Sequence, residues 1–497
     1  MSNLTRANWE QRAKDLKIEG YAFINGEYTT AASNATFECI SPVDGRLLAH
    51  VASCDSVDAQ HAVENARATF NSGVWSRLAP AKRKATMIRF AGLLMQHAEE
   101  LALLETLDMG KPISDSLHID IPGAAQALSW SGEAIDKVYD EVAATPHDQL
   151  GLVTREPVGV VGAIVPWNFP LMMACWKLGP ALSTGNSVIL KPSEKSPLTA
   201  IRIAVLAVEA GIPKGVLNVL PGYGHTVGKA LALHNDVDTL AFTGSTKIAK
   251  QLLIYSGESN MKRVWLEAGG KSPNIVFADA PNLQAAAESA ASAIAYNQGE
   301  VCTAGSRLLV ERSIKDKFLS MVIEALKTWK PGNPLDPATN VGALVDIQQM
   351  NTVLSYIESG HRDGAKLIAG GKRVLQEIGG TYVEPTIFDG VSNAMKIAQE
   401  EIFGPVLSVI AFDTAEEAIQ IANDTPYGLA AAVWTQDISK AHLTAKALRA
   451  GSVWVNQYSG GDMTAPFGGF KQSGNGRDKS LHAFDKYTEL KSTWIKL

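Results

Sequence analysis

The chain has 497 residues, a net charge of −6 at pH 7 and 46% hydrophobic residues, which is enough for more than one domain and a large core. It contains no Lys/Arg-rich run and no window of about 18 consecutive apolar residues, so we expect neither a nucleic-acid partner nor a membrane span. The first residues lack the apolar stretch of a signal peptide, and the four scattered cysteines fit neither a disulfide framework nor a paired-cysteine metal site, so we expect a cytoplasmic protein.

The first part of the chain is predicted to be helical. The spacing of apolar residues predicts helices over residues 56–70, 81–108 and 121–139. Gly110, followed by Lys111 and Pro112, is expected to end the second of these helices. The polar segment 140–157 alternates weakly between apolar and polar residues, and we interpret it as a hairpin-like excursion from the main body.

From Val158 onward, short apolar runs alternate with helix-like segments. The alternation is typical of doubly wound parallel sheets. The sequence therefore predicts an α/β fold with two such domains meeting near residue 268, and a ligand site is expected at the junction. The runs of the first series are 158–165, 187–190, 217–220 and 239–242, and those of the second are 274–277, 307–310, 407–412, 430–434 and 452–455.

The last residues, 486–497, have the composition of a β-strand with no chain left to follow it. An apolar terminal strand favours aggregation unless it is paired. We therefore expect this strand, together with the 140–157 excursion, to join the sheet of another subunit.

Cys302 is the candidate nucleophile, because glycines at 299 and 305 flank it and allow the backbone to approach a bound substrate closely. A buried thiol that only packs is the alternative interpretation, and it describes most lone cysteines. Glu267 favours catalysis, since it lies in Leu266-Glu267-Ala268-Gly269-Gly270, where the two glycines leave the backbone free to swing. A carboxylate on such a backbone is suited to act as a general base.

Three segments at strand ends carry features of a nucleotide site. Lys191-Pro192-Ser193-Glu194 places a cation and a carboxylate at the end of a predicted strand, where ribose hydroxyls bind in doubly wound sheets. Gly222 to Gly228 has the spacing GxGxxxG, a weak phosphate-loop signal. Phe242-Thr243-Gly244-Ser245-Thr246 opens a helix with small residues, which leaves N–H groups free for a pyrophosphate.

Asn168 lies in Val165-Pro166-Trp167-Asn168-Phe169-Pro170, a turn stiffened by two prolines. A fixed side-chain amide can donate a hydrogen bond to a developing oxyanion, and losing such a donor costs about 3 to 4 kcal/mol in the transition state. An asparagine that satisfies only the turn backbone is the alternative.

Taken together, these motifs resemble the NAD(P)-dependent aldehyde dehydrogenase family over nearly the whole chain. Ala268, where a leucine is usual, and Ala249, where a glycine is common, are the visible departures. The motifs that carry the resemblance are Trp167-Asn168-Phe169-Pro170, Lys191-Pro192-Ser193-Glu194, Phe242-Thr243-Gly244-Ser245, Leu266 to Pro273, Gly299 to Cys302, Glu401-Ile402-Phe403-Gly404-Pro405-Val406 and Pro466-Phe467-Gly468-Gly469.

The resemblance implies a chemistry for each of three residues. Cys302 attacks the aldehyde, Asn168 and the Cys302 backbone N–H hold the oxyanion, and Glu267 activates the water that hydrolyses the thioester. The coenzyme is expected to be NAD, and no metal is called for. The coenzyme-binding residues that the resemblance implies are Ile164, Trp167, Lys191, Ser193, Glu194, Gly224, Gly228, Phe242, Gly244, Ser245, Glu401 and Phe403.

The family's build implies two doubly wound Rossmann-type domains and a β oligomerisation element, in a homodimer or homotetramer. The NAD-binding domain would comprise residues 1–139 and 158–268, and the catalytic domain residues 269–480. Residues 140–157 and 481–497 would form the oligomerisation element.

The substrate is the least determined part of the interpretation. The runs Cys175 to Pro180, Gly461 to Thr464 and Lys471 to Ser480 look like those of bacterial γ-glutamyl-γ-aminobutyraldehyde and 4-guanidinobutyraldehyde dehydrogenases of polyamine and arginine catabolism. An ω-amino-, γ-glutamylamino- or guanidino-aldehyde is thereby implied. The substrate-binding residues would be Asp120, Phe169, Met173, Trp176, Asp462 and Phe467, with the polar tail near Asp120 or Asp462.

Three other functions remain open at this level. A broad-specificity aliphatic aldehyde dehydrogenase would use the same residues. A coenzyme-independent cysteine acyl-transferase or hydrolase would need a histidine base, and no histidine lies in the motifs of Cys302 or Asn168. A non-enzymatic role is the third, since folds outlive activities.

Overall fold

The structure, a computed structural model, describes residues 4–497, and within this range it contains two large sheets, each of seven strands. The first sheet is parallel over β11, β10, β7, β8 and β9, and the β1–β2 hairpin extends it in the antiparallel sense. In order across the sheet, the strands are β11 (Arg263–Ala268), β10 (Thr239–Gly244), β7 (Val160–Ile164), β8 (Ser187–Lys191), β9 (Leu217–Val219), β1 (Ala22–Ile24) and β2 (Glu27–Thr29).

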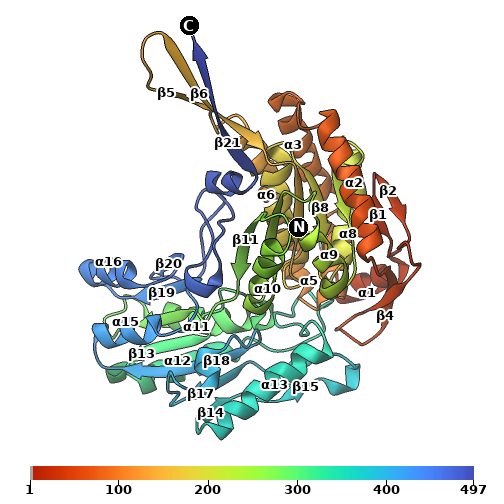
Figure 1. Ribbon diagram of the computed structural model, residues 1–497. Coiled ribbons are helices and arrows are strands. Elements are labelled where there is room, and N and C mark those ends of the chain that lie inside the picture. Colours follow the sequence, from red (N-terminus) through yellow and green to blue (C-terminus); the bar gives the residue numbers. More distant parts are fainter. Residues whose placement is uncertain (1–3) are drawn as a thin grey trace.

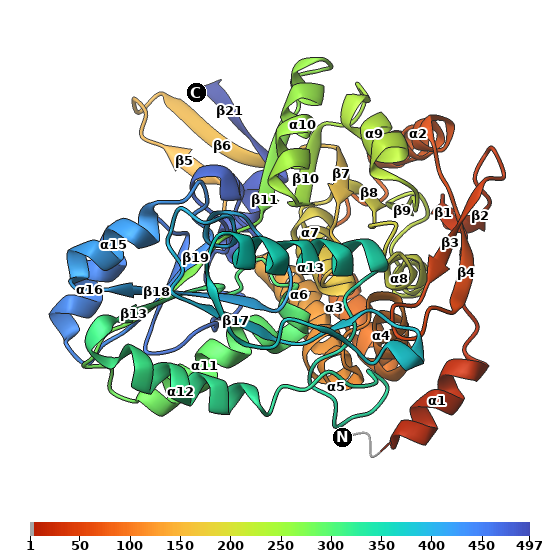
Figure 2. The same ribbon diagram turned by 90° about the horizontal axis from the view of Figure 1, so that it is seen from below.

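The second sheet is parallel except for its edge strand β14. Helices cover both faces of each large sheet (Figures 1 and 2), so the predicted α/β class with two doubly wound sheets is confirmed. The strands in order are β14 (Lys366–Ala369), β17 (Thr386–Asp389), β18 (Val406–Phe412), β13 (Arg307–Glu311), β12 (Pro273–Val276), β19 (Ala430–Trp434) and β20 (Ser452–Val455).

The helices begin and end at recognisable signals. Asp55 caps α2 with its carboxylate, and Gly73, in the left-handed conformation, ends it. The helices are α1 (Arg6–Asp15), α2 (Ser56–Ser72), α3 (Pro80–Gln96), α4 (Ala98–Met109), α5 (Ile113–Asp115), α6 (Ile121–Ala134), α7 (Pro170–Ser183), α8 (Leu198–Glu209), α9 (Lys229–Leu233), α10 (Thr246–Gly257), α11 (Leu283–Ala295), α12 (Lys315–Leu326), α13 (Ile347–Arg362), α14 (Lys396–Gln399), α15 (Ala415–Asn423) and α16 (Ile438–Ala447).

The single helix predicted over 81–108 is wrong in one respect: the chain makes two helices, α3 and α4, separated at His97. The reason is burial, because α3 buries one face whereas α4 is buried on all sides from Leu101 to Met109. The chain therefore turns at His97 and directs α4 into the interior. The predicted ending at Gly110 is confirmed, and its φ of 91° is one that glycine adopts readily.

A third sheet, antiparallel, projects from the body and carries the C-terminus at its tip (Figure 1). It consists of β21 (Thr488–Lys496), β6 (Gln149–Pro157) and β5 (Glu141–Ala143), with β21 at one edge. The terminal strand thus pairs with β6 of its own chain along its full length, from Thr488 opposite Pro157 to Lys496 opposite Gln149. Two short two-stranded sheets, β3 (Thr36–Ile40) with β4 (Leu47–Ala52) and β15 (Arg373–Val374) with β16 (Tyr382–Val383), complete the strands of this range.

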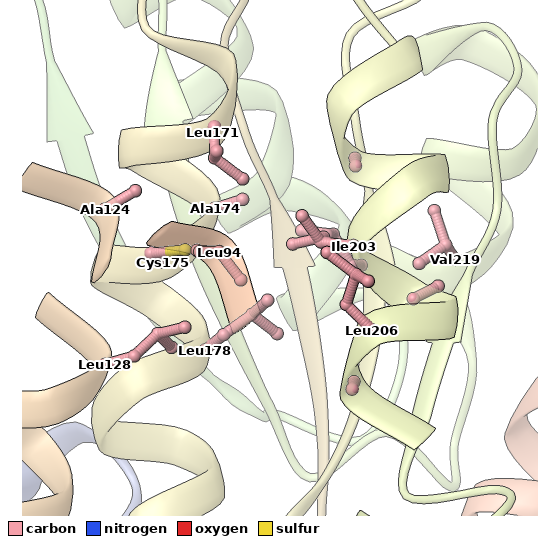
Figure 3. Close-up of a cluster of buried hydrophobic side chains, with 14 of the residues drawn as sticks. Leu94, Ala124, Leu128, Leu171, Ala174, Cys175, Leu178, Ile203, Leu206 and Val219 are labelled. Atoms are coloured by element: carbon pink, nitrogen blue, oxygen red, sulfur yellow. The ribbon is translucent and has the colours of Figure 1, made fainter. Parts of the chain in front are cut away.

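The largest hydrophobic core lies where α3, α6, α7 and α8 pack on the first sheet. Figure 3 shows Cys175 of α7 among these apolar side chains, together with Leu94 and Leu128. Cys175 is fully buried here, so its thiol packs and α7 is held rigidly. A rigid α7 fixes the Asn168 turn that precedes it.

Within residues 4–497, no helix combines the length and apolar content needed to cross a membrane.

Candidate active site

The junction of the two large sheets encloses a cavity of about 840 Å³. The chain passes from β11 of the first sheet to β12 of the second across Gly269–Ser272. Cys302, Glu267 and Asn168 all line the cavity. The structure therefore brings the three predicted catalytic residues together, although they lie on separate segments of the chain.

The Cys302 loop follows α11 and is held by a backbone that few residues adopt. Asn297 and Gln298 have φ values of 47° and 57°, and Gly299 follows with 71°. A Cβ on Gly299 would collide with the main chain of Gly404 and Pro405. We expected this glycine to admit substrate, but the structure shows that it admits a neighbouring backbone.

The second flanking glycine, Gly305, has a similar role. Its Cβ would lie 2.8 Å from the ring of Tyr458. The Tyr458 hydroxyl donates a hydrogen bond to the carbonyl oxygen of Thr303, at 2.5 Å. Both glycines therefore position the Cys302 loop by close protein packing.

Cys302 as a whole residue is partly exposed, whereas Cys39, Cys54 and Cys175 are buried. Burial of the Cys302 sulfur, with the charges of Glu267 and Glu401 nearby, raises the pKa of the thiol to about 12. Backbone N–H groups of Thr303 and Cys302 oppose this rise. At neutral pH the resting group is therefore a neutral thiol, which would have to lose its proton to act as a nucleophile.

Asn168 lies between β7 and α7, and its amide points at the Cys302 loop. The Nδ2 atom of Asn168 donates a hydrogen bond to the carbonyl oxygen of Glu300 at 2.8 Å. The Asn297 side chain donates to the carbonyl oxygen of Asn168 at 3.1 Å and to that of Glu300 at 3.2 Å. One N–H of Asn168 fixes the amide, and the other is free to donate into the cavity.

Glu267 is the penultimate residue of β11, and its main chain bridges to Gly474. Its carboxyl is buried, and Oε1 has no hydrogen-bond partner. Burial and then the charge of Asp478 raise the pKa of Glu267 well above its usual value, against the opposing charges of Lys177 and Lys486. An unpartnered buried carboxyl oxygen is suited to take a proton from water.

The glycines after Glu267 do not provide the swinging backbone that we expected. A Cβ on Gly269 would overlap the carboxylate of Glu401, and one on Gly270 would lie 2.9 Å from the carbonyl oxygen of Cys302. The N–H of Gly270 donates to Glu401 at 3.2 Å. These glycines therefore bring Glu401 and the Cys302 loop close to the end of β11.

Most predicted coenzyme residues lie at the carboxyl ends of adjacent parallel strands. Ile164 ends β7, Lys191 ends β8 and Gly244 ends β10, and these three strands are neighbours. The side chain of Phe242 fills the space that a Cβ on Gly244 would need. Ser245 is the N-cap of α10. The carboxyl edge of such a sheet is where nucleotides bind.

Lys191 donates a hydrogen bond to Glu194 at 3.1 Å, and the Glu194 side chain is 34% exposed. Ser193 lies between them and is nearly buried. Gly224 and Gly228 bound a single π-helical turn, and a Cβ on either would meet nothing within 4 Å. The space above this edge is therefore open to a ligand.

Trp167, Glu401 and Phe403 also line the cavity. The Trp167 and Phe403 rings meet edge to face, with centroids 5.0 Å apart. Phe403 has a φ of 56°, a strained value for an aromatic residue. Burial raises the pKa of Glu401 to about 7.

A model of the family described as "Aldehyde dehydrogenase family" matches residues 28–493. The chain belongs to the aldehyde dehydrogenase family. This confirms the resemblance inferred from the seven motifs.

Three relatives illustrate the similarity. The NADP/NAD-dependent aldehyde dehydrogenase PuuC of Escherichia coli (strain K12) is 59% identical over 491 residues, covering 99% of this chain and 98% of the relative. The indole-3-acetaldehyde dehydrogenase AldA of P. syringae, solved with NAD+ and IAA, is 88% identical, covers 100% of both chains and superposes with a TM-score of 0.99. A γ-glutamyl-γ-aminobutyraldehyde dehydrogenase of Burkholderia cenocepacia is 61% identical, covering 99% of this chain and 100% of its own, with a TM-score of 0.98.

In this aldehyde dehydrogenase, four of the predicted substrate residues line the cavity: Phe169, Met173, Trp176 and Phe467. The Trp176 and Phe467 rings lie edge to face, with centroids 5.2 Å apart. Asp462 also lines the cavity, on an exposed loop, and its carboxylate accepts hydrogen bonds from the N–H and hydroxyl of Thr464.

The prediction that Asp120 binds the substrate tail is wrong, because Asp120 does not border the entrance of the cavity. It ends a π-helical turn before α6 and is fully buried, where its carboxylate pairs with Lys111. The Lys111 ammonium also lies 3.8 Å from Glu105 and 4.1 Å from the centroid of the Phe169 ring. A buried carboxylate needs a cation partner, so Asp120 supports the wall behind Phe169. Its neighbour Ile119 lines the cavity instead.

Sequence reasoning missed several cavity residues, among them Tyr296, Trp454 and Lys479. Tyr296 comes directly before the Cys302 loop, and its ring lies 6.3 Å from that of Phe169. Adjacency to the nucleophile was the one signal that could have identified it. No histidine of the described residues lines the cavity, which argues against a cysteine acyl-transferase or hydrolase.

Proposed function

We propose that the protein oxidises an aldehyde to the carboxylic acid with NAD through a covalent intermediate on Cys302. The observation that carries the proposal is that one cavity holds Cys302, Glu267 and Asn168 and is also bounded by Ser245 and Phe403 of the coenzyme motifs. Nucleophile, oxyanion donor, base and coenzyme edge thus meet at one place.

The residues of the chain supply all but the oxidant. The Cys302 sulfur bonds to the aldehyde carbon as its proton passes to the Glu267 carboxylate and from there to solvent, which restores the carboxylate. The oxyanion accepts hydrogen bonds from Asn168 Nδ2 and the Cys302 N–H. When bound, NAD accepts the hydride and leaves a thioester on Cys302. Glu267 then takes a proton from the water that attacks the thioester and passes it to the departing Cys302 sulfur, so that the acid leaves and the thiol is restored.

The open strand edge fits a dinucleotide. Lys191 and Glu194 would hold the adenosine ribose, Ser245 and the N-terminus of α10 the pyrophosphate, and Glu401 with Phe403 the nicotinamide riboside. The empty space over Gly224 and Gly228 and the unpartnered buried hydroxyl of Thr243 support this fit. The remaining members of the set, Ile164, Trp167, Ser193, Phe242 and Gly244, would shape the walls.

The proposed substrate is an ω-amino-, γ-glutamylamino- or guanidino-aldehyde of polyamine or arginine catabolism. The B. cenocepacia relative, named for γ-glutamyl-γ-aminobutyraldehyde, supports it. The cavity supports it too, because Met173, Trp176 and Phe467 would enclose a methylene chain and Asp462 lies in the outer wall.

Indole-3-acetaldehyde is a second candidate substrate. The P. syringae relative named for it is 88% identical to this chain, and the cavity is lined by Phe169, Trp176, Tyr296, Trp454 and Phe467. Aromatic rings of this kind stack on an indole. A broad-specificity enzyme would accept both substrates.

Steady-state assays with NAD test both candidates. NADH formation should be observed with 4-guanidinobutanal, 4-(γ-glutamylamino)butanal, indole-3-acetaldehyde and hexanal, and kcat/KM should rank them. Cys302→Ala should abolish turnover while NAD still binds in a titration, because the thiol is a covalent participant. Dehydrogenase activity remaining in this variant would remove Cys302 from the mechanism, and a preference for hexanal would leave a general aldehyde dehydrogenase.

The proposal includes assembly into a dimer or tetramer in the cytoplasm. It is supported by β21, which lies at a sheet edge and exposes Leu490 and Trp494 at 62% each. An exposed apolar edge strand is suited to pair with another subunit. Sedimentation equilibrium should show a dimer or tetramer, and a monomer would contradict this part.

A further inference from the structure

Lys479 lies in the wall of the cavity on a backbone that few lysines adopt. Its φ is 57°, and that of Ser480 is 50°. Two successive non-glycine residues in the left-handed region persist only where the surroundings hold them. Here Asp478 exchanges two backbone hydrogen bonds with Phe467, at 2.7 and 2.8 Å, and the Ser480 N–H donates to Met463 at 2.7 Å. The segment is thus fixed so that Lys479 reaches the cavity.

The Lys479 ammonium lies against two aromatic rings. It is 4.6 Å from the centroid of the Trp176 ring and 5.7 Å from that of Phe467. Within the part of the chain that the structure describes, it makes no ion pair within 4.0 Å and no hydrogen bond, while burial lowers its pKa. Lys177 and Lys486, the buried lysines beside it, both pair with Asp478. The Lys479 ammonium therefore has no polar partner among the described residues and is available to a ligand.

The charges of two carboxylates, Asp478 and then Asp462, act on Lys479 through space rather than by contact. Asp478 already pairs with Lys177 and Lys486, which leaves Asp462 as the carboxylate that no cation of the described residues pairs with. Its own oxygen is engaged with Thr464, at 2.5 Å from the hydroxyl. The outer wall of the cavity thus presents one cation and one anion that do not neutralise each other. The Lys479 ammonium would repel a tail that carries only a guanidinium or an ammonium group. A tail that carries both a carboxylate and an ammonium could pair with Lys479 and with Asp462.

We propose that Lys479 selects substrates whose distal end carries a carboxylate, and that Asp462 receives an ammonium borne on the same tail. Resting on the proposed aldehyde oxidation, this assigns the substrate class as ω-aldehydes that end in an α-amino-acid group. The carboxylate accepts a charge-assisted hydrogen bond from the Lys479 ammonium. The methylene part of the tail packs on the Trp176 and Phe467 rings, which also hold the lysine in place.

A matched substrate pair tests the assignment. The first aldehyde is 4-(γ-glutamylamino)butanal, the second is the same molecule without its α-carboxylate, and hexanal is the neutral reference. With wild type and NAD, removal of the carboxylate should lower kcat/KM about tenfold or more, the scale of one hydrogen bond to a charged group. Most of the loss should be in KM, since the tail does not react.

Lys479→Met should bring kcat/KM for the two matched aldehydes to within about twofold, because the charge that distinguishes them is gone. Lys479→Glu should reverse the preference. Lys479→Asn serves as a second neutral variant, since asparagine accepts the left-handed backbone readily. Lys317→Met, on the exposed face of α12, is the matched control and should keep the wild-type ratio.

Two outcomes are distinguishable. If wild type forms NADH with hexanal but the carboxylate ratio is the same in wild type, Lys479→Met and Lys479→Asn, the assignment of Lys479 is overturned and the aldehyde oxidation stands. If wild type forms NADH with none of the three aldehydes, the proposed function is overturned, and this inference with it.

Discussion

Asn168→Ala should lower kcat much more than it lowers the free energy of unfolding. The contacts of the Asn168 side chain allow both effects to be estimated. The substitution removes the hydrogen bond to the Glu300 carbonyl, but Asn297 still donates to that oxygen at 3.2 Å. No buried acceptor is left without a donor, so the free energy of unfolding should fall by only about 1 kcal/mol. The loss of the N–H that faces the oxyanion should cost about 3 to 4 kcal/mol in the transition state, or roughly a 100- to 1,000-fold fall in kcat.

The assay is steady-state NADH formation with saturating NAD and aldehyde, accompanied by thermal unfolding. Asn218→Ala is the matched control, since Asn218 is an equally buried amide that accepts from the Asn25 N–H and donates to Gly215. It should lower the melting temperature yet leave kcat close to wild type. If Asn168→Ala is folded and loses less than about fivefold in kcat, far below the ordinary cost of an oxyanion donor, the reasoning is refuted.

Three further predictions concern the same cavity. Glu267→Gln should accumulate an acyl adduct on Cys302, visible by mass spectrometry with NAD and aldehyde, because an amide cannot take a proton from water; unmodified protein with slow turnover would count against it. NAD should be preferred over NADP, and Glu194→Ser should raise the NADP/NAD ratio of kcat/KM by about tenfold as repulsion of the 2′-phosphate is removed; an unchanged ratio would mean that Glu194 points away from the ribose. Since the pKa of the Cys302 thiol is raised to about 12, its alkylation by iodoacetamide in the coenzyme-free enzyme should quicken about tenfold per pH unit from 7 to 10 as the thiolate population grows; a plateau below pH 9 would contradict the cause assigned here.

Much of the fold could be predicted from local sequence patterns. Apolar runs predicted β19 and β20 to the residue and β13 and β18 to within one residue. For β19, β13 and β18 the reason is that a strand covered on both faces is largely apolar. Gly110 marked the end of α4 for a similarly local reason, since only a left-handed residue fits there. The break at His97 had no local signal, because it depends on where α4 is buried.

The candidate catalytic residues were chosen from their chemistry and motifs, but their environments could not be predicted in this way. Gly269, Gly299 and Gly305 were assigned to backbone freedom or substrate access, and each instead admits a neighbouring group of the protein. The pKa of Cys302 likewise follows from burial and from Glu267 and Glu401, neither of which is near it in sequence. Electrostatic environments are sums over spatial neighbours.

The difference between what sequence determined and what the tertiary structure decided is clearest at Asp120, Asp462 and Lys479. By sequence alone, an aspartate was equally suited to receive a cationic tail at position 120 or 462, and nothing distinguished Lys479 from the charged residues around it. Sequence determined the family, the fold class and the candidate nucleophile, because these depend on residue types in a fixed order. Only the tertiary structure decided that Asp120 faces Lys111 in the interior while Lys479 faces the cavity, because the direction of a side chain is set by packing between segments that are distant in the chain.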